Sequence, residues 1–525
     1  MSRLRRTGIL VLAAALVLTA CTSSDPPSGP LEPVGDTPPD GYAARPIPSA
    51  QIDAAVGGLD QLVTDVMQRS GVPGMSVAVV RGGQIVYAKG FGVRELGKDA
   101  AVDADTVFQL ASVSKSVGST CVSAAVTNGL VSWSDPVVKH LPDFSLSDPE
   151  ITRRVTIADL YAHRSGLPYQ AGDDLEAFGF DRAGVLARLG QFELEPFRIT
   201  YRYSNFGMTT GGEAVAAAAK RPWEQLCAER LYAPLGMTSS SSSYADFLNR
   251  ENRATLHFRT AEKTFEPLYT RNADAQSPAG GVSSSANDMA RWLLMNLADG
   301  KAGAQPVIDP DVLRESHTAQ VATGPLPSSD SRSRFYGYGF NVENTSTGHV
   351  RLGHSGAFYV GAGTAFGLLP AADVGIVALT NGSPVGAAEA VTTGFTDLVR
   401  TGAQERDWLD FFGPIFGAIF VNQSKVAAPP PTDAAPARPL EAYVGRYTSP
   451  YAGDIAVTRD GDRLTLTIGP KQLSAPLTHY DGDTFSWLAP GGNGEPVSAV
   501  TFSGGTGTAQ SVDIELVQRP RFERA

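Results

Sequence analysis

The chain of 525 residues is long enough for two or three domains, and its 42% hydrophobic and 18% charged residues are typical of a globular protein. Acidic residues outnumber basic ones by 54 to 43, and the formal net charge of −11 argues against nucleic acid as a partner. The seven histidines show no spacing typical of metal ligands, so we predict neither a metal nor another cofactor.

The first twenty residues have the pattern of a secretory signal. Arginines near the start precede an apolar run over residues 9–18, which is too short to span a bilayer. The tetrapeptide LTAC ending at Cys21 resembles a bacterial lipobox, which implies cleavage before Cys21 and lipid attached to that cysteine. We therefore expect an extracytoplasmic protein, lipid-anchored to the bacterial cell membrane, with the lipid bilayer as a partner. The alternative is a plain signal peptide with an incidental cysteine.

The folded part opens with a predicted helix and hairpin. Apolar residues recur at helical spacing over residues 52–67 and predict one amphipathic helix. Strand-like runs over 75–80 and 84–88 flank an Arg-Gly-Gly turn, the pattern of a β-hairpin. From 110 to about 320 the pattern indicates mostly helices and loops. The later elements are strands over 353–369 and 374–380 and a last amphipathic helix over 385–399.

A serine and a lysine stand three residues apart near the start of a predicted helix over residues 111–127. Residues at this spacing share one helix face, so the Lys115 amine can reach the Ser112 hydroxyl. A serine needs a neighbouring base to become a nucleophile, and a lysine serves when burial lowers its pKa. Among the nine lysines only Lys115 has a serine three residues before it. Taken alone, the pattern fits a buried helix with incidental hydroxyls equally well.

Two cysteines follow Cys21. Cys121 belongs to the apolar face of the predicted helix 111–127. An extracytoplasmic setting permits a disulfide with Cys227, but buried free thiols are common. We favour free thiols and leave the pairing open.

Two further motifs come later in the chain. Tyr203-Ser204-Asn205 is the only Y-x-N, and it begins 203 − 112 = 91 residues after the serine. His354-Ser355-Gly356 leads into strand-like residues. Taken singly, the tyrosine fits a core residue with a satisfied hydroxyl, and Asn205 fits a helix cap.

The C-terminal part has the pattern of a small all-β domain. A connecting segment with a proline-rich linker precedes it. Short alternating runs then recur at the spacing of a barrel or sandwich, over residues 443–447, 464–468, 484–487, 497–502 and 512–516. With its Y-V-G-x-Y pattern beginning at Tyr443, this tail resembles a small lipocalin-like domain.

The three ordered motifs S-x-x-K, Y-x-N and H-x-G resemble those of the serine β-lactamase and penicillin-binding-protein superfamily. The Y-x-N and H-x-G versions look most like class C β-lactamases and the related esterases and D-amino-acid peptidases. The resemblance implies an α/β (α+β) fold, in which helices flank an antiparallel sheet that carries an inserted, mostly helical lobe. The resulting domains are a signal peptide (1–20), a flexible tether (21–49), a serine hydrolase domain (50–402), a connecting segment with linker (403–437) and a lipocalin-like barrel (438–525).

The resemblance also implies a role for each motif residue. Ser112 would attack a carbonyl carbon and form an acyl-enzyme that water then hydrolyses. Lys115 and Tyr203 would move the protons, the tyrosine with a pKa lowered by nearby positive charge, and Asn205 would orient the lysine and the substrate. The remaining members of the predicted site are His354 and Gly356 of the third motif and the backbone N–H of Ala357, which would complete an oxyanion hole with the N–H of Ser112.

The expected substrate is a small molecule or peptide with an ester or amide bond. Many relatives place a lysine where this chain has His354, whose ordinary pKa of roughly 6.5 leaves it mostly uncharged near neutral pH. We therefore expect weak activity on anionic β-lactams and D-alanine peptides, and a kcat/KM for anions that falls as pH rises through the His354 pKa. The alternatives are a non-catalytic penicillin-binding-like sensor and a barrel that carries an apolar ligand.

Overall fold

The structure is a computed structural model that describes residues 46–525, apart from 327, 422 and 491–495. The predicted signal peptide, Cys21 and most of the tether lie outside these residues. Ala43–Ala525 form one unit by their contacts, and this unit contains a large mixed-element domain and a β-barrel. Both confirm the predicted fold class.

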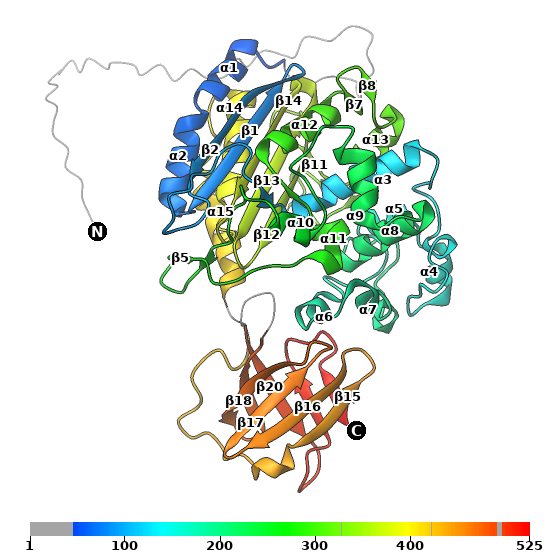
Figure 1. The fold of residues 1–525 in the computed structure, drawn as a ribbon, viewed down its shortest axis with the longest axis vertical. Coiled ribbons are helices and arrows are strands. Elements are labelled where there is room, and N and C mark those ends of the chain that lie inside the picture. Colours follow the sequence, from blue (N-terminus) through cyan, green and yellow to red (C-terminus); the bar gives the residue numbers. More distant parts are fainter. Residues whose placement is uncertain (1–45, 327, 422, 491–495) are drawn as a thin grey trace, which may run out of the picture. The chain divides into compact units, whose positions relative to one another are not determined.

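An antiparallel sheet of eight strands forms the centre of the larger domain (Figure 1), in the order β2-β1-β14-β13-β12-β11-β10-β9. Its N-terminal hairpin pairs with its late strands, since Met75 on β1 lies opposite Thr380 on β14. The sheet is thus assembled from both ends of the domain, with the predicted helical lobe inserted between them. Its strands are β1 Gly74–Arg81, β2 Gln84–Gly92, β9 Val321–Ala322, β10 Arg334–Tyr336, β11 Asn341–Asn344, β12 Val350–Phe358, β13 Ala362–Leu369 and β14 Val374–Thr380.

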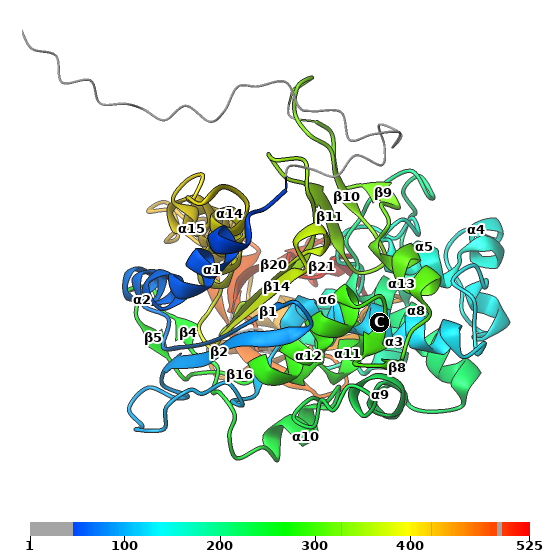
Figure 2. The same cartoon turned by 90° about the horizontal axis from the view of Figure 1, so that it is seen from above.

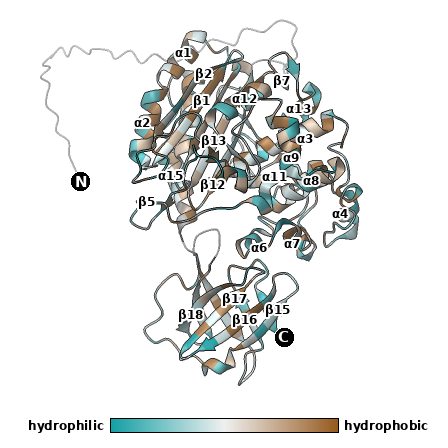
Figure 3. Ribbon diagram, viewed as in Figure 1, coloured by the Kyte–Doolittle hydropathy of each residue, from teal (hydrophilic) through white to brown (hydrophobic). Residues whose placement is uncertain are grey.

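Helices cover both faces of this sheet (Figure 2). One face packs on α1 (Ser49–Gly57), α2 (Leu59–Ser70) and α14 (Ala387–Thr401), while α12 (Ala286–Leu297) lies against the other. Every residue of β13 and β14 is therefore buried, and these strands are mostly apolar on both faces rather than alternating (Figure 3).

The prediction of one helix over 52–67 is wrong in one respect, because the segment forms two helices. They meet at Gly57–Gly58, and two successive glycines weaken a helix. Helix α12 begins with a side-chain cap, since the Ser285 hydroxyl accepts the N–H of Asp288.

Between β2 and β9 the chain forms a mostly helical lobe. Its central helix is α3 (Ser114–Thr127), which is buried on all sides from Ser114 to Ala125. The predicted helix over 111–127 therefore starts three residues later, after a 3-10 turn, η2 (Ala111–Val113). The other helices of the lobe are α4 Pro149–Arg154, α5 Ile157–Tyr161, α6 Asp173–Ala177, α7 Arg182–Leu186, α8 Asn205–Ala219, α9 Trp223–Cys227, α10 Tyr244–Leu248, α11 Ser277–Gly280 and α13 Pro310–His317.

The two remaining cysteines form a disulfide, which corrects the expectation of free thiols. Cys121 on α3 and Cys227 at the end of α9 have Cα atoms 5.4 Å apart, and both side chains are buried. Their separation of 106 residues in sequence gave no sign of this proximity.

Replacing both cysteines with alanine should lower the free energy of unfolding by about 2–5 kcal/mol, because the bridge restricts the unfolded chain. Urea unfolding with and without reductant measures this. Reductant should destabilise the wild type and leave the double variant unchanged. Equal stability of the oxidised and the fully reduced wild type, with reduction checked by thiol counting, would contradict the prediction.

The C-terminal strands close into a barrel, β15 to β22. The five predicted runs correspond to strands, and three further strands were missed. Tyr443, Phe485 and Phe502 pack together in its interior with ring centroids 4.7–5.8 Å apart, which disfavours the alternative of a barrel that carries an apolar ligand. The strands are β15 Gly445–Ser449, β16 Gly453–Asp460, β17 Arg463–Ile468, β18 Leu473–Asp481, β19 Thr484–Leu488, β20 Val497–Ser503, β21 Ser511–Ile514 and β22 Arg521–Arg524.

Candidate active site

Ser112 lies in the tight turn η2, directly before α3. The preceding residue, Ala111, has a φ of +47°, a strained conformation for a residue with a side chain. Strand β12 passes so close to this turn that a Cβ on Gly356 would lie 2.3 Å from the Leu110 carbonyl oxygen and 2.9 Å from the Ser112 nitrogen. Only glycine fits there. The H-x-G motif thus brings its strand against the backbone of Ser112.

Two side chains reach the Ser112 hydroxyl. The Lys115 Nζ is 3.1 Å from Ser112 Oγ, and the Tyr203 hydroxyl is 2.6 Å from the same oxygen. Tyr203 comes from the loop before α8, where the Ser204 hydroxyl caps the helix by accepting the N–H of Gly207. The first two predicted motifs therefore meet at one oxygen atom.

Lys115 is fully buried, and its amine is held from three directions. Besides Ser112 Oγ, the Nζ lies 2.7 Å from Asn205 Oδ1 and 2.9 Å from the Ala279 carbonyl oxygen. Burial lowers the Lys115 pKa to about 7, although the charge of Asp173 opposes this shift. A neutral amine here can donate its two N–H groups to the two carbonyl-type oxygens. Its lone pair then points to the serine hydroxyl.

Tyr203 differs from the expectation, because burial raises its pKa well above the ordinary value rather than lowering it. The expected positive charge is weak, since the Lys115 amine, 4.5 Å from the tyrosine ring centroid, is itself partly neutral near pH 7. Tyr203 therefore stays a phenol and donates its hydrogen bond to Ser112 Oγ. His163 packs on its ring, with centroids 4.7 Å apart.

Asp173, the first residue of α6, belongs to this network, although no motif pointed to it. The Asn205 Nδ2 donates to Asp173 Oδ2 at 2.7 Å, so Asp173 is linked through Asn205 to the Lys115 amine. Burial, then the nearby Glu176, raise the Asp173 pKa to about 8. The only signal in the sequence is a short acidic run, which usually marks a solvated surface.

His354 lies on β12 but differs from its expected role. Its Nδ1 is 2.6 Å from the Ser355 carbonyl oxygen, so this nitrogen carries the proton and donates. Its Nε2 then accepts from the Tyr336 hydroxyl at 2.9 Å. Burial, and then the nearby Lys115, lower the His354 pKa to about 3. Both ring nitrogens thus have hydrogen-bond partners within the protein. The imidazole is uncharged at pH 7 and stays uncharged well into the acidic range.

A cavity of about 1130 Å³ opens over Ser112, and Asp173, Asn205 and Ala357 line it. Ala357 follows the H-x-G motif on β12, so its backbone lies beside the nucleophile, where the oxyanion hole was expected. Arg271 also lines the cavity, but its guanidinium is ion-paired to Glu176 at 2.5 Å.

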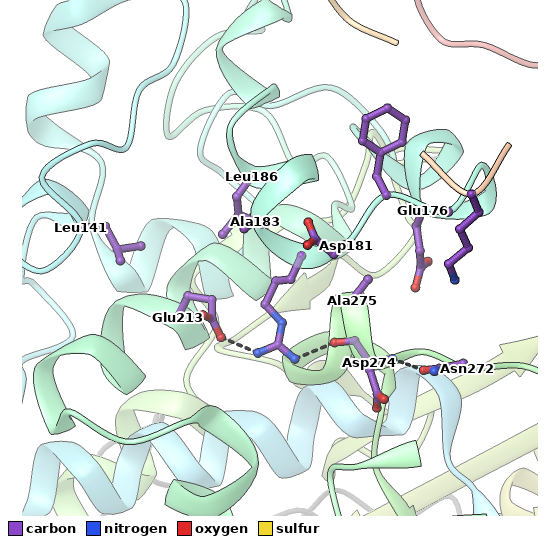
Figure 4. A pocket seen from close by; sticks show the side chains of 13 residues that line it. Leu141, Glu176, Asp181, Ala183, Leu186, Glu213, Asn272, Asp274 and Ala275 are labelled. Carbon is purple, nitrogen blue, oxygen red and sulfur yellow. Dashed lines mark hydrogen bonds and ion pairs between the residues drawn. The ribbon is translucent and has the colours of Figure 1, made fainter. Parts of the chain in front are cut away.

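A second cavity of about 660 Å³ shares Glu176 with the first, and Figure 4 shows the side chains that line it. Arg182 also lines this cavity, donating to Glu213 at 2.6 Å and to the Asp274 carbonyl oxygen at 2.5 Å. Its guanidinium is also ion-paired to Glu224, so Arg182 on α7 connects α8, α9 and the segment at Asp274.

Over the described part of the chain, no group of three or more His, Cys, Asp or Glu side chains is arranged to hold a metal ion. No helix among the same residues has the length and apolar character needed to cross a bilayer.

Comparisons with known proteins agree with this geometry. A family model described as Beta-lactamase matches residues 59–399, and a Domain of unknown function (DUF3471) matches residues 429–524. The unguisins hydrolase ungD' of Aspergillus campestris is 25% identical over 441 residues, 79% of this chain and 80% of the relative. Penicillin-binding protein 4 of Amycolatopsis lactamdurans is 29% identical over 385 residues, 70% of this chain and 92% of the relative.

A solved structure shares the fold. The octameric penicillin-binding protein homologue from Pyrococcus abyssi aligns with a TM-score of 0.57 and 19% identity, over 89% of this chain and all of that one. Since the family model covers more than half of the chain and the relatives include hydrolases, the chain belongs to the β-lactamase family and is a serine hydrolase of the β-lactamase and penicillin-binding-protein superfamily.

Proposed function

We propose that the chain is a lipid-anchored, extracytoplasmic serine hydrolase that cleaves ester or amide bonds through an acyl-enzyme on Ser112. The observation that supports this best is the position of Ser112 Oγ between a buried lysine at 3.1 Å and a tyrosine hydroxyl at 2.6 Å. A serine placed between a base and an acid of this kind is equipped for acyl transfer.

In the acylation step the neutral Lys115 takes the proton of Ser112 as Oγ bonds to the substrate carbonyl carbon. The N–H groups of Ser112 and Ala357 stabilise the oxyanion. The tetrahedral intermediate collapses as the bond to the leaving group breaks, and the Tyr203 phenol supplies the leaving group's proton. The Lys115 ammonium restores the phenol, which returns lysine to its basic form. Water then attacks the acyl carbon, with Lys115 again as base. The bond from this carbon to Ser112 Oγ breaks, the carboxylic acid leaves, and the Lys115 ammonium returns its proton to the serine oxygen.

The surroundings of Ser112 favour substrates without a negative charge near the reacting bond. The His354 imidazole is neutral, and the Arg271 guanidinium in the cavity is already paired with Glu176. Asp173 adds a carboxyl group to the same cavity. An ester or amide without a carboxylate therefore fits better than an anionic β-lactam, and we favour esterase or D-amino-acid peptidase activity.

The Cys121–Cys227 disulfide supports the extracytoplasmic part of this proposal, because disulfides persist mainly in oxidising compartments. The anchor itself rests on the LTAC tetrapeptide that ends at Cys21.

The test of the proposal is covalent labelling with a fluorophosphonate, with the labelled residue mapped by mass spectrometry and turnover measured on a panel of uncharged esters and amides. We expect the label on Ser112 and multiple turnovers. Labelling without turnover would instead favour a sensor.

Because His354 stays neutral above about pH 4, it should not affect specificity between pH 6 and 8. This revises the expectation drawn from its ordinary pKa. Lys115 and Asp173 titrate in this range, so the test compares the wild type with His354→Gln. For two esters that differ only by a carboxylate, the ratio of their kcat/KM values should have the same pH dependence in both proteins. A drop for the anionic ester that disappears in His354→Gln would show that His354 is charged near pH 6.

Cys21→Ser should move the protein from the membrane fraction to the soluble or secreted fraction without changing kcat/KM, because a lipobox cysteine acts only as an anchor. Fractionation followed by immunoblotting measures this, with Ser134→Ala, a change at an exposed serine that leaves Cys21 in place, as the control. Continued membrane association of the Cys21→Ser variant would show that the anchor lies elsewhere.

A further inference from the structure

The segment over residues 169–174 forms one wall of the cavity above Ser112 and is held in an unfavourable conformation. Tyr169, Gln170 and Asp173 from this segment line the cavity. Gln170 has a φ of +55°, a strained conformation for a residue with a side chain, whereas the φ of +91° at Gly172 is one that glycine adopts readily. Such a segment keeps its shape only where surrounding contacts hold it.

The contacts that hold it come partly from the C-terminal barrel. Gln518, in the turn after β21, donates from Nε2 to the Gln170 carbonyl oxygen at 2.9 Å. Its Oε1 accepts the N–H of Gly172 at 3.0 Å, and its own backbone N–H donates to Asp174 Oδ2 at 2.9 Å. The Tyr451 hydroxyl of the barrel donates to the other oxygen of Asp174 at 2.6 Å.

This segment is joined to the catalytic groups by hydrogen bonds. The Gln170 N–H donates to the carbonyl oxygen of Tyr203 at 2.8 Å, so two hydrogen bonds in series join Gln518 to the backbone of Tyr203. At the other end Asp173 accepts from Asn205, which in turn accepts from Lys115.

The barrel also lines the cavity itself. Glu515 and Leu516, from the turn that includes Gln518, line the same space as Ser112, together with Pro496. Ring contacts add to the hydrogen bonds, since Tyr451 packs on Phe192 with centroids 5.1 Å apart and Trp487 on Phe178 at 6.1 Å.

We infer that the C-terminal barrel is a working part of the active site: Gln518 and Tyr451 position the 169–174 segment, and through it Tyr203, Asn205 and Lys115. Gln518 is a positioning residue, because it acts through Gln170 and Gly172. The inference rests on the hydrolytic function proposed above.

The test compares Gln518→Ala and Tyr451→Phe with the wild type, with Gln510→Ala as the matched control. Gln510 is an exposed barrel glutamine whose side chain donates to the Thr508 carbonyl oxygen instead. Fluorophosphonate titration counts active sites, so that kcat/KM is expressed per working enzyme. Misplacing catalytic groups by about 1 Å costs up to roughly 100-fold, and we expect a loss of about tenfold for Gln518→Ala. The pH midpoint of kcat/KM should also shift, which a merely structural role would not cause.

The inference would be overturned if both variants, per titrated active site, kept the kcat/KM and the pH midpoint of the wild type. It would also be overturned if the loss of activity came entirely from a smaller number of titratable sites. Hydrogen exchange gives a readout independent of hydrolysis. The Gly172 amide should exchange faster in Gln518→Ala than in the wild type, and at the wild-type rate in Gln510→Ala. If the wild type itself fails to label at Ser112, the proposed function fails, and unchanged exchange at Gly172 would separately refute the positioning role.

Discussion

Ser112→Ala is expected to reduce kcat by roughly 10⁴- to 10⁶-fold, the loss typical of removing a serine nucleophile, and to end covalent labelling. The fold should survive, because the side chain is only half-buried and its hydroxyl does not bond to the backbone in the structure. Far-UV circular dichroism and the unfolding midpoint check the fold, and single-turnover assays with an uncharged ester check the loss.

The control is Ser134→Ala, which changes an exposed serine and should keep full activity and labelling. A label that remained on the Ser112→Ala variant at Ser114 would overturn the assignment. Ser114 is unsuited to attack, because it is fully buried and its hydroxyl accepts the N–H of Val282 at 3.0 Å.

The sequence predicted the position of the candidate site better than its electrostatics. Ser112, Lys115, Tyr203 and Asn205 meet as their motifs indicated, because each motif preserves the spacing that its chemistry needs. Asp173 was missed, since its link to Asn205 depends on how two distant segments of the lobe fold together. The Tyr203 pKa was predicted in the wrong direction because a motif does not report burial, which dominates this shift.

The fold shows a similar limit: features that depend on neighbouring residues were predicted, and features that depend on contacts between distant segments were not. Strand-like runs and turn signals predicted β1, β2 and β14 correctly, because these patterns are local. Strand β18 was missed since Pro476 interrupts its pattern, and β22 has only four residues, two of them arginines. The disulfide could not be predicted, because Cys121 and Cys227 become neighbours only when α9 packs against α3.

The buried amine of Lys115 predicts the pH dependence of the reaction. Only the neutral amine can accept the serine proton, and burial lowers the Lys115 pKa to about 7. Below that pH the lysine is protonated, so kcat/KM for an uncharged ester should fall about tenfold per pH unit toward acid and level off above about pH 8. A flat profile between pH 5 and 8 would contradict the assignment of Lys115 as the base.

Two substitutions separate this explanation from others. Lys115→Arg replaces the base with a group that stays protonated, so activity should fall by about 10²- to 10⁴-fold, while Lys301→Arg at an exposed lysine should change nothing. Asp173→Asn keeps an acceptor for Asn205 but removes the negative charge that raises the Lys115 pKa. This charge is only partial where Lys115 titrates, because the Asp173 pKa is itself raised to about 8. The midpoint of the profile should therefore move to lower pH. A midpoint that stayed in place, or moved to higher pH, would mean that Asp173 is uncharged where Lys115 titrates or that the titrating group is not this lysine.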